Sequence, residues 1–196
     1  MPRIGNVTHS AAFLSGLLLL VALAAAHDAR AADCKDRKPT TWDIEVAPAS
    51  EPGERLEVTG QVISSTDRKP LAGVTVYVYH ADAKGKYSVA ANQPPRLCGI
   101  LRTNQHGAYR IRTSMPGGYG GFPAHIHYEV WGPRVARQHL FVNLERRTAV
   151  RDTSRVPVAT VSPRLIGEVR AAITRPVERG ADGLWRCVRD LAVGTH

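Results

Sequence analysis

The sequence has few cysteines, and none of them has a metal-site spacing. Cys34, Cys98 and Cys187 are its three cysteines, and no CxxC or mixed Cys/His spacing supports a zinc site. It also has no dense basic run, although 26 Lys and Arg against 17 Asp and Glu give a formal net charge of +9. Scattered basic residues are typical of a solvated surface, and such a surface also attracts anionic aromatic acids. No nucleic-acid-binding motif is present, so nucleic acid is not expected as a partner.

The sequence also has no apolar run long enough to span a membrane. Its main apolar run, Ala11 to Ala26, is shorter than the roughly 20 residues that a spanning helix needs. Arg3 precedes the run, and small-residue cleavage patterns follow it. We expect a signal peptide over residues 1–26, with cleavage there or as late as residue 32. The expected protein is exported, periplasmic or secreted, and has no stable membrane anchor after cleavage.

Export permits disulfides, and three cysteines allow one bridge and one free thiol. The sequence leaves all three pairings open. A bridge between Cys34 and Cys187 would join the two ends of the mature chain, and we favour it.

Alternating apolar and polar residues predict an all-β fold. Leu56, Val58 and Val62 alternate with polar residues, and Val74, Val76 and Val78 do the same in a second run. Further strands are expected over 101–103, 108–112, 124–131, 139–144 and 184–191, with 101–103 and 108–112 forming a hairpin around the turn at 104–107. Short strands separated by Gly/Pro turns indicate a β-sandwich of mostly antiparallel strands.

One short C-terminal helix is also expected. Ser162 is a candidate N-cap, Pro163 suits the first helical position, and Pro176 would end the helix. Apolar residues recur at helical spacing between them. Residues 27–54 are polar and contain prolines, so we expect an extended N-terminal arm there and a β-sandwich domain over 55–196.

The segment Met115 to Val130, MPGGYGGFPAHIHYEV, holds the strongest candidate site. On a strand, His125 and His127 would point to the same face, about two strand rises apart, which suits two ligands of one metal. Tyr119 lies just before them on a glycine-rich turn. A phenolate oxygen favours a hard, strongly Lewis-acidic ion such as Fe³⁺, whereas zinc usually recruits imidazole, thiolate or carboxylate.

A second segment, Val74 to Tyr87, reads VTVYVYHADAKGKY and ends in a tyrosine after a strand and a glycine turn. Together with PGGY and PAHIH, it resembles the intradiol ring-cleavage dioxygenases, the family of catechol and protocatechuate 3,4-dioxygenases. The resemblance covers roughly residues 57–144 and is closest to the short, secreted branch. It implies a non-haem Fe³⁺ held by Tyr87, Tyr119, His125 and His127. Tyr77 and Tyr79 are expected either to line the pocket or to pack in the core.

The resemblance implies an oxidoreductase that inserts both atoms of O₂ between the two hydroxylated carbons of a catechol, giving a muconate-type product. It gives Tyr119 a catalytic role, since this tyrosine would leave the metal and accept a substrate proton. Gln138 resembles a family glutamine near the oxygen-binding side and is the second catalytic candidate.

One position departs from the family pattern. Phe122 stands where members commonly carry an arginine, and the loss of such a cation is expected to slow turnover about 10²-fold. Arg102 and Arg134 are candidates to replace it from elsewhere. The alternative is a non-catalytic β-sandwich binding module of the transthyretin-like or carboxypeptidase-regulatory type, which leaves the order of the four ligands unexplained.

Overall fold

The computed structural model describes residues 34–90, 93–146 and 173–196. These residues form strands and no helix, so the all-β prediction is confirmed. The strands are β1 (Asp43–Glu45), β2 (Arg55–Ser64), β3 (Thr75–His80), β4 (Leu97–Arg102), β5 (Ala108–Ser114), β6 (His125–Gly132), β7 (Val135–Arg146), β8 (Ile173–Arg179), β9 (Trp185–Val188) and β10 (Leu191–Val193). The expected signal peptide lies outside the described residues. No helix in the described part of the chain is long and apolar enough to cross a membrane.

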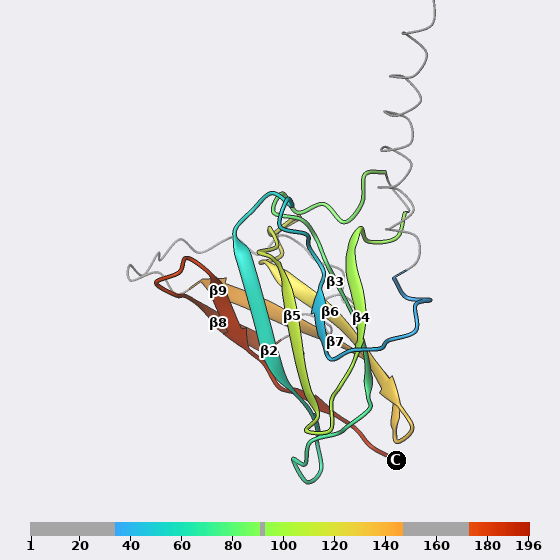
Figure 1. Ribbon diagram of the computed structural model, residues 1–196. Helices are drawn as coiled ribbons and strands as arrows, with labels where there is room; N and C mark the ends of the chain where they lie inside the picture. Colours follow the sequence, from blue (N-terminus) through green and yellow to red (C-terminus); the bar gives the residue numbers. More distant parts are fainter. Residues whose placement is uncertain (1–33, 91–92, 147–172) are drawn as a thin grey trace, which may run out of the picture.

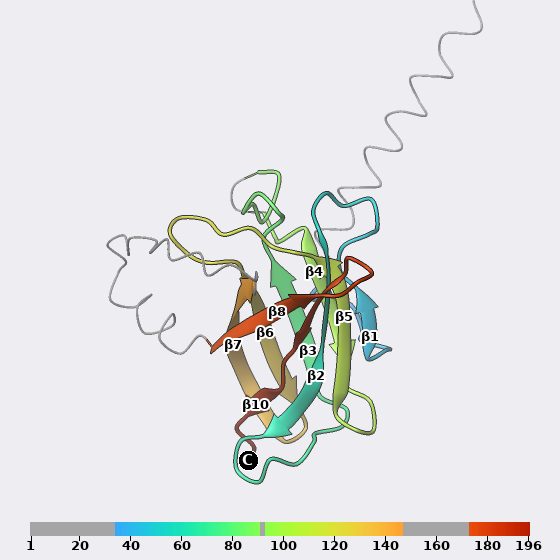
Figure 2. The same ribbon diagram turned by 90° about the vertical axis from the view of Figure 1, so that its left-hand side faces the viewer.

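The strands follow one hydrogen-bonded path in the order β1-β5-β2-β9-β8-β7-β6-β3-β4, and β10 adds to β2. The path bends at β8, which pairs with β7 on one side and with β9 on the other. One layer therefore contains β1, β5, β2 and β9, and β7, β6, β3 and β4 face it across the core (Figures 1 and 2). Antiparallel pairs join β2 to β5, β3 to β4 and β6, β6 to β7, and β8 to β9.

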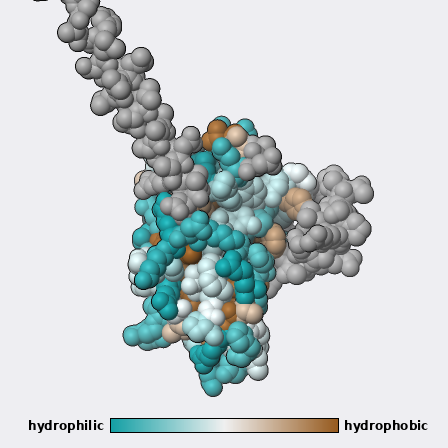
Figure 3. Space-filling view, turned by 90° about the vertical axis from the view of Figure 1, so that its right-hand side faces the viewer, coloured by the Kyte–Doolittle hydropathy of each residue, from teal (hydrophilic) through white to brown (hydrophobic). Residues whose placement is uncertain are grey.

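The core lies between these two layers because each strand alternates its side chains across the sheet. Val58, Val76, Ile111 and Val142 are at most 1% exposed and point inward from four different strands. The outer surface seen in Figure 3 is mainly hydrophilic, with apolar side chains in small separate patches. Burial of the apolar face therefore fixes the register of each strand.

Strand β6 decides where the candidate site lies. Ile126, Tyr128 and Val130 point into the core and are at most 1% exposed. By the period of two, His125 and His127 point to the opposite, outer face of the sheet. The predicted strand and the predicted shared face of the two histidines are both confirmed.

The predicted hairpin around residues 104–107 is wrong. The turn exists, with the Gly107 amide donating to the Asn104 carbonyl at 3.0 Å. The flanking strands, however, diverge: β4 pairs with β3, and β5 pairs with β2 and β1. Each strand has an apolar face to bury in a different layer, and this long-range pairing overrides the local turn signal.

The predicted C-terminal helix is not observed. Its residues 162–172 lie outside the described residues, and residues 173–176 begin β8, which runs parallel to β7. Pairing with the free edge of β7 therefore overrides the local helical spacing. The expected extended arm contributes strand β1, which pairs with β5, and the expected strand over 184–191 is divided into β9 and β10.

Candidate metal centre

Tyr87 is presented by a tight loop that Asp82 organises. The Asp82 carboxylate accepts hydrogen bonds from the backbone amides of Lys84 and Lys86, both at 2.9 Å, and its carbonyl accepts one from Gly85. Gly85 has a φ of 78°, in the left-handed region that glycine adopts without strain. The loop between β3 and β4 therefore has a defined shape, and it turns the Tyr87 ring toward the outer face of the sheet.

Tyr119 is presented by a two-residue turn. The amides of Tyr119 and Phe122 donate to each other's carbonyls at 3.2 and 2.8 Å, and Gly120 and Gly121 between them both have positive φ. Positive φ at both central positions is the signature of a type I′ turn, which explains the two glycines in the sequence. The turn lies between β5 and β6 and places the Tyr119 ring beside the Tyr87 ring, with 5.4 Å between ring centroids.

The two histidines are held by their neighbours on the sheet. His125 Nδ1 lies 2.8 Å from the Pro123 carbonyl, so this nitrogen carries the proton and donates it, which leaves a lone pair on Nε2. The His127 ring stacks on Tyr79 of β3, with 4.4 Å between centroids, and contacts Phe141 of β7 at the same distance. Both imidazoles are therefore fixed in orientation before any ligand binds.

These elements bring four donor atoms together. The Tyr87 hydroxyl lies 2.7 Å from His127 Nε2, 3.1 Å from His125 Nε2 and 3.1 Å from the Tyr119 hydroxyl. His125 Nε2 is 3.1 Å from His127 Nε2 and 3.4 Å from the Tyr119 hydroxyl. The structure therefore brings together all four side chains that the sequence nominated as ligands.

The donor set fits one metal ion. Metal–ligand bonds of about 2 Å place neighbouring donor atoms about 3 Å apart, and the measured separations lie in this range. Among the described residues, no cluster of three or more His, Cys, Asp or Glu side chains could hold a metal. A metal centre here therefore depends on the two tyrosine oxygens, and this donor chemistry suits a hard, trivalent ion.

The electrostatics of the site also suit a cation. Burial, followed by the nearby His125, lowers the pKa of His127 to about 3, and burial lowers the pKa of His125 as well. Both imidazoles are therefore neutral near pH 7, as ligands must be. Burial, followed by the hydrogen bond with Tyr119, raises the pKa of Tyr87 well above its usual value. A positive charge at the centre would offset the cost of burying a charged oxygen and would favour the phenolate form of Tyr87.

Comparison with known proteins gives the family. A family model described as "Dioxygenase" matches residues 35–185, which is most of the chain and includes all four donors. This chain belongs to the intradiol ring-cleavage dioxygenase family. Catechol 1,2-dioxygenase 2 of Acinetobacter lwoffii is 31% identical over 116 residues, covering 49% of this chain and 42% of that protein. Catechol 1,2-dioxygenase 1 of the same organism is 34% identical over 110 residues, covering 51% and 35%. The chain spans less than half the length of these relatives.

Solved structures show the same fold. Wild-type catechol 1,2-dioxygenase of Acinetobacter radioresistens superposes with a TM-score of 0.60 at 18% identity, covering 93% of this chain and 71% of that one. The dioxygenase domain of a carbohydrate-binding fusion protein from Streptomyces sp. SirexAA-E gives 0.58 at 23% identity, covering 82% and 93%. The likeness extends over most of this chain, and at these identities it establishes the shared β fold.

Two phenylalanines flank the four donors of this family member. Phe122 lies beside Tyr119 and His125, with ring centroids 5.9 and 6.3 Å away, and Phe141 covers the other side of the histidine pair. The structure does not bring Arg102 or Arg134 to the place of the missing arginine. Arg102 donates to the Gly73 carbonyl, and Arg134 lies in the turn between β6 and β7. The flanks of the site are therefore apolar.

Gln138, the second catalytic candidate, is not brought to the four donors. It is paired with Val130 on β6, whose side chain points into the core, and its amide is bonded to Gly194. Phe141, three residues further along β7, is the residue opposite His127. A shift of one or three residues along a strand changes the face that a side chain occupies, so the place of Gln138 follows from the register of β7 on β6.

Sequence reasoning missed an ion-pair network behind Tyr87. The Arg96 guanidinium pairs with both oxygens of Glu51 at 2.6 Å and with Asp82 at 3.2 Å, while the Arg96 amide donates to the Tyr87 carbonyl. The network ties both ends of the Tyr87 loop to the segment before β2. Glu51 and Arg96 are 45 residues apart and lie outside the quoted motifs, so only the fold reveals their pairing.

The favoured pairing of Cys34 with Cys187 is wrong. Cys34 forms a disulfide with Cys98, and Cys187 is free and buried. Cys187 points into the core from β9 and is only 2% exposed, whereas Cys98 lies on the outer face of β4, where the chain at Cys34 reaches it. The bridge therefore fastens the N-terminal segment over the sheet that carries the metal centre.

Proposed function

We propose that this protein is an Fe³⁺-dependent intradiol dioxygenase that cleaves a catechol between its two hydroxylated carbons, with O₂ as co-substrate and a muconate-type product. The proposal depends on one observation, the convergence of the two tyrosine oxygens and two imidazole nitrogens in ligand order. Membership of the family and the catechol-cleaving names of its relatives support it. A non-catalytic β-module would not require these four side chains to meet.

Tyr87, Tyr119, His125 and His127 would hold the ion. A ferric ion bound there would act as a Lewis acid that binds a catecholate and makes its ring carbon reactive toward O₂. The chain supplies neutral imidazoles, which the Pro123 carbonyl and the Tyr79 and Phe141 rings keep in orientation. The apolar rings of Phe122 and Phe141 lower the local dielectric and restrict the approach of water.

The two tyrosines have different supports, and this difference assigns their roles. The Tyr87 loop is held by the Asp82 turn and by the Arg96–Glu51 ion pair. The Tyr119 turn is closed by the reciprocal backbone bonds between Tyr119 and Phe122. Tyr119 is thus the side chain that moves at lower cost, and its phenolate oxygen accepts a proton from the incoming catechol. Tyr87 stays in place.

We also propose that the protein is exported. The Ala11–Ala26 run after Arg3 supports this, as does the Cys34–Cys98 disulfide, because such bridges persist in oxidising compartments. The catechol and O₂ would then be met outside the cytoplasm.

The test is to purify the protein after iron-supplemented expression and to measure iron content, the visible tyrosinate-to-iron absorption, and oxygen uptake with catechol. We expect one iron per chain, a coloured protein, and a muconate-type product in step with oxygen uptake. Tyr119→Phe should shift or bleach the colour and stop turnover, while Tyr128→Phe, which changes a core-facing tyrosine of β6 outside the donor set, should keep both. A colourless, iron-free protein, or oxygen uptake without ring cleavage, would overturn the proposal.

A further inference from the structure

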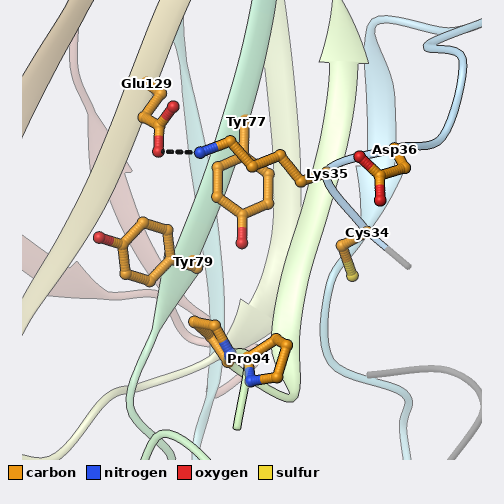
Figure 4. A pocket seen from close by; sticks show the side chains of 8 residues that line it. Cys34, Lys35, Asp36, Tyr77, Tyr79, Pro94 and Glu129 are labelled. Carbon is orange, nitrogen blue, oxygen red and sulfur yellow. Dashed lines mark hydrogen bonds and ion pairs between the residues drawn. The ribbon is translucent and has the colours of Figure 1, made fainter. Parts of the chain in front are cut away.

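A pocket of about 410 Å³ lies on the outer face of the sheet that carries the candidate metal centre, and Figure 4 shows the side chains that line it. Tyr79 belongs to both, because it lines the pocket and its ring stacks on His127. Glu129, which closes one end of the pocket, is two residues beyond His127 on β6, a strand distance of about 7 Å. A substituent that extends from the four donors past the Tyr79 ring would reach this pocket.

The pocket is lined by the rings of two tyrosines and two prolines, by the ammonium of Lys35 and by the carboxylates of Asp36 and Glu129. Tyr77 and Tyr79 pack 5.4 Å apart along β3 and form the floor, and Pro94 and Pro95 form a wall. Lys35 reaches across the Tyr77 ring, with its ammonium 5.3 Å from the ring centroid. These surfaces suit a planar, unsaturated substituent, since ring and proline faces pack well against flat groups.

Lys35 can be recruited by a ligand without leaving a buried charge unpaired. In the structure its ammonium binds Glu129 Oε1 at 2.6 Å, and Arg137 binds Glu129 Oε2 at 3.0 Å. The Glu129 side chain is only 6% exposed, so a lone carboxylate there would be costly, whereas the Lys35 side chain is 46% exposed. If Lys35 turns to a ligand, Arg137 remains on Glu129. Asp36 adds a second carboxylate to the pocket lining, and Arg137 stays with Glu129, so Lys35 is the cation that an anionic ligand would engage.

The disulfide positions this lysine. Cys34, the neighbour of Lys35, is bonded to Cys98, which lies opposite Tyr79 on β4. The bridge therefore keeps the Lys35 backbone at the pocket edge, although the lysine side chain itself is partly exposed. Lys38, three residues along the same segment, lines a separate pocket of about 220 Å³ and provides a matched control.

We propose that Lys35 is a specificity-determining residue that binds the carboxylate of a catechol carrying a flat, carboxylate-terminated substituent, and that the Cys34–Cys98 disulfide positions it for this role. The inference rests on the proposed catechol-cleaving function and names the substrate class of that site. The substituent lies between Tyr79 and the proline wall, and its carboxylate replaces Glu129 as the partner of the ammonium.

The test compares 3,4-dihydroxycinnamate with its methyl ester and with catechol. Dissociation constants are measured by calorimetry without oxygen, on iron-loaded protein, so that binding is read without turnover. We expect the acid to bind about tenfold more tightly than the ester, the ratio typical of one charge-assisted hydrogen bond. In Lys35→Met the ester-to-acid ratio of dissociation constants should fall to about one, while catechol affinity is unchanged. Lys35→Arg should retain much of the wild-type ratio. Lys38→Met should have the wild-type ratio.

Three outcomes would overturn the inference: equal affinity for acid and ester in the wild type, an unchanged ratio in Lys35→Met, or an equal loss in Lys38→Met. Tighter binding of 3,4-dihydroxyphenethylamine than of the acid would also overturn the inference. The ammonium group of that ligand would then bind Glu129, and Glu129 would be the residue that selects the substrate. If catechol itself is neither bound nor cleaved by iron-loaded wild type, the proposed function fails and this inference fails with it. If catechol is cleaved but acid and ester are equivalent, only this inference fails.

A second variant tests the disulfide without removing the lysine. In the Cys34→Ala, Cys98→Ala double variant Lys35 is retained but loses its anchor, so the acid-to-ester ratio should fall toward one with catechol affinity preserved. Circular dichroism checks that the sheet is intact. A folded double variant with the wild-type ratio would show that the bridge has no part in positioning Lys35.

Discussion

The Gly117 amide donates a 2.8 Å hydrogen bond to the Asp82 carbonyl, and this bond joins the two loops that carry Tyr87 and Tyr119. Asp82 also organises the Tyr87 loop, so one residue sets the position of one tyrosine and is bonded to the turn that presents the other. The loops can approach this closely only without a side chain at position 117. A Cβ atom there would lie 2.4 Å from the Asp82–Gly85 loop, at the Ala83 carbonyl.

Gly117→Ala is therefore expected to separate the two tyrosines and to weaken iron binding by about 10- to 100-fold, the usual cost of losing the support of metal ligands. Competition with a chelator measures the affinity. Gly132→Ala is the control, because its added Cβ would meet Val74 only at an ordinary contact distance of 3.5 Å. Wild-type iron affinity in Gly117→Ala would show that contact between the loops does not define the centre.

Gln138→Ala is expected to leave catalysis intact. The Gln138 amide binds Gly194 through both its oxygen and its nitrogen, and it makes no contact with the four donors. Its removal should lower the free energy of unfolding by about 1 kcal/mol, the net worth of such bonds. The catechol kcat/KM should stay within about twofold of wild type. A tenfold loss of kcat at unchanged stability would restore the catalytic role that the sequence suggested.

His80 makes the stability of the protein depend on pH. This side chain is fully buried on the core face of β3, where Nδ1 donates to the Ala81 carbonyl and Nε2 accepts from the Thr113 hydroxyl. Burial lowers its pKa from 6.5 to about 4. Between these values the unfolded chain binds a proton that the folded chain does not, so stability falls as the pH decreases from about 6.5 to about 4. The expected loss from His80 is about 3 kcal/mol.

Urea unfolding of the iron-free protein between pH 7 and pH 4 measures this loss. His125 and His127, whose pKa values are also lowered, add to it, so the His80 share is read as the difference between wild type and His80→Gln. His80→Gln should have a shallower dependence on pH than wild type. Equal slopes in the two proteins would mean that His80 is protonated in the folded state.

The three cysteines are expected to differ in reactivity. Cys187 is 2% exposed and burial raises its pKa, so it should not react with a thiol reagent until the protein unfolds. Reduction of the Cys34–Cys98 bridge, which closes a 64-residue separation, should lower the free energy of unfolding by roughly 2–5 kcal/mol. Thiol titration before and after denaturation should give no thiol and then one thiol per oxidised chain. A reactive thiol in the native protein would contradict this placement.

The sequence predicted the meeting of Tyr119, His125 and His127 because the signal for these three residues is local. The alternation in β6 places His125 and His127 on one face, and the adjacent glycines allow the turn that brings Tyr119 to them. Tyr87 is 38 residues from His125, and its place followed only from the family resemblance. The resemblance nominated Gln138, but the register of β7 on β6 places it away from the donors, and sequence spacing alone does not reveal that register.

The fold was less predictable where long-range pairing competes with local preference. The turn at residues 104–107 looks like a hairpin, yet β4 and β5 belong to different layers. Residues 173–176 were expected to end a helix, yet they pair with β7, and the rest of that expected helix lies outside the described residues. The disulfide partner of Cys34 also depends on which face of β4 carries Cys98, a property of the assembled sheet and not of the cysteine spacing.

The four donors come from two segments far apart in the sequence, the loop that carries Tyr87 and the turn and strand that carry Tyr119, His125 and His127. An ion bound by all four donors would cross-link these segments reversibly. By mass action, the melting temperature of the protein would then rise with metal concentration. Demetallation should loosen the loop and the turn long before it disturbs the strands beneath them. Thermal shift measurements can therefore report the affinity for the metal ion even in a variant that has lost all turnover.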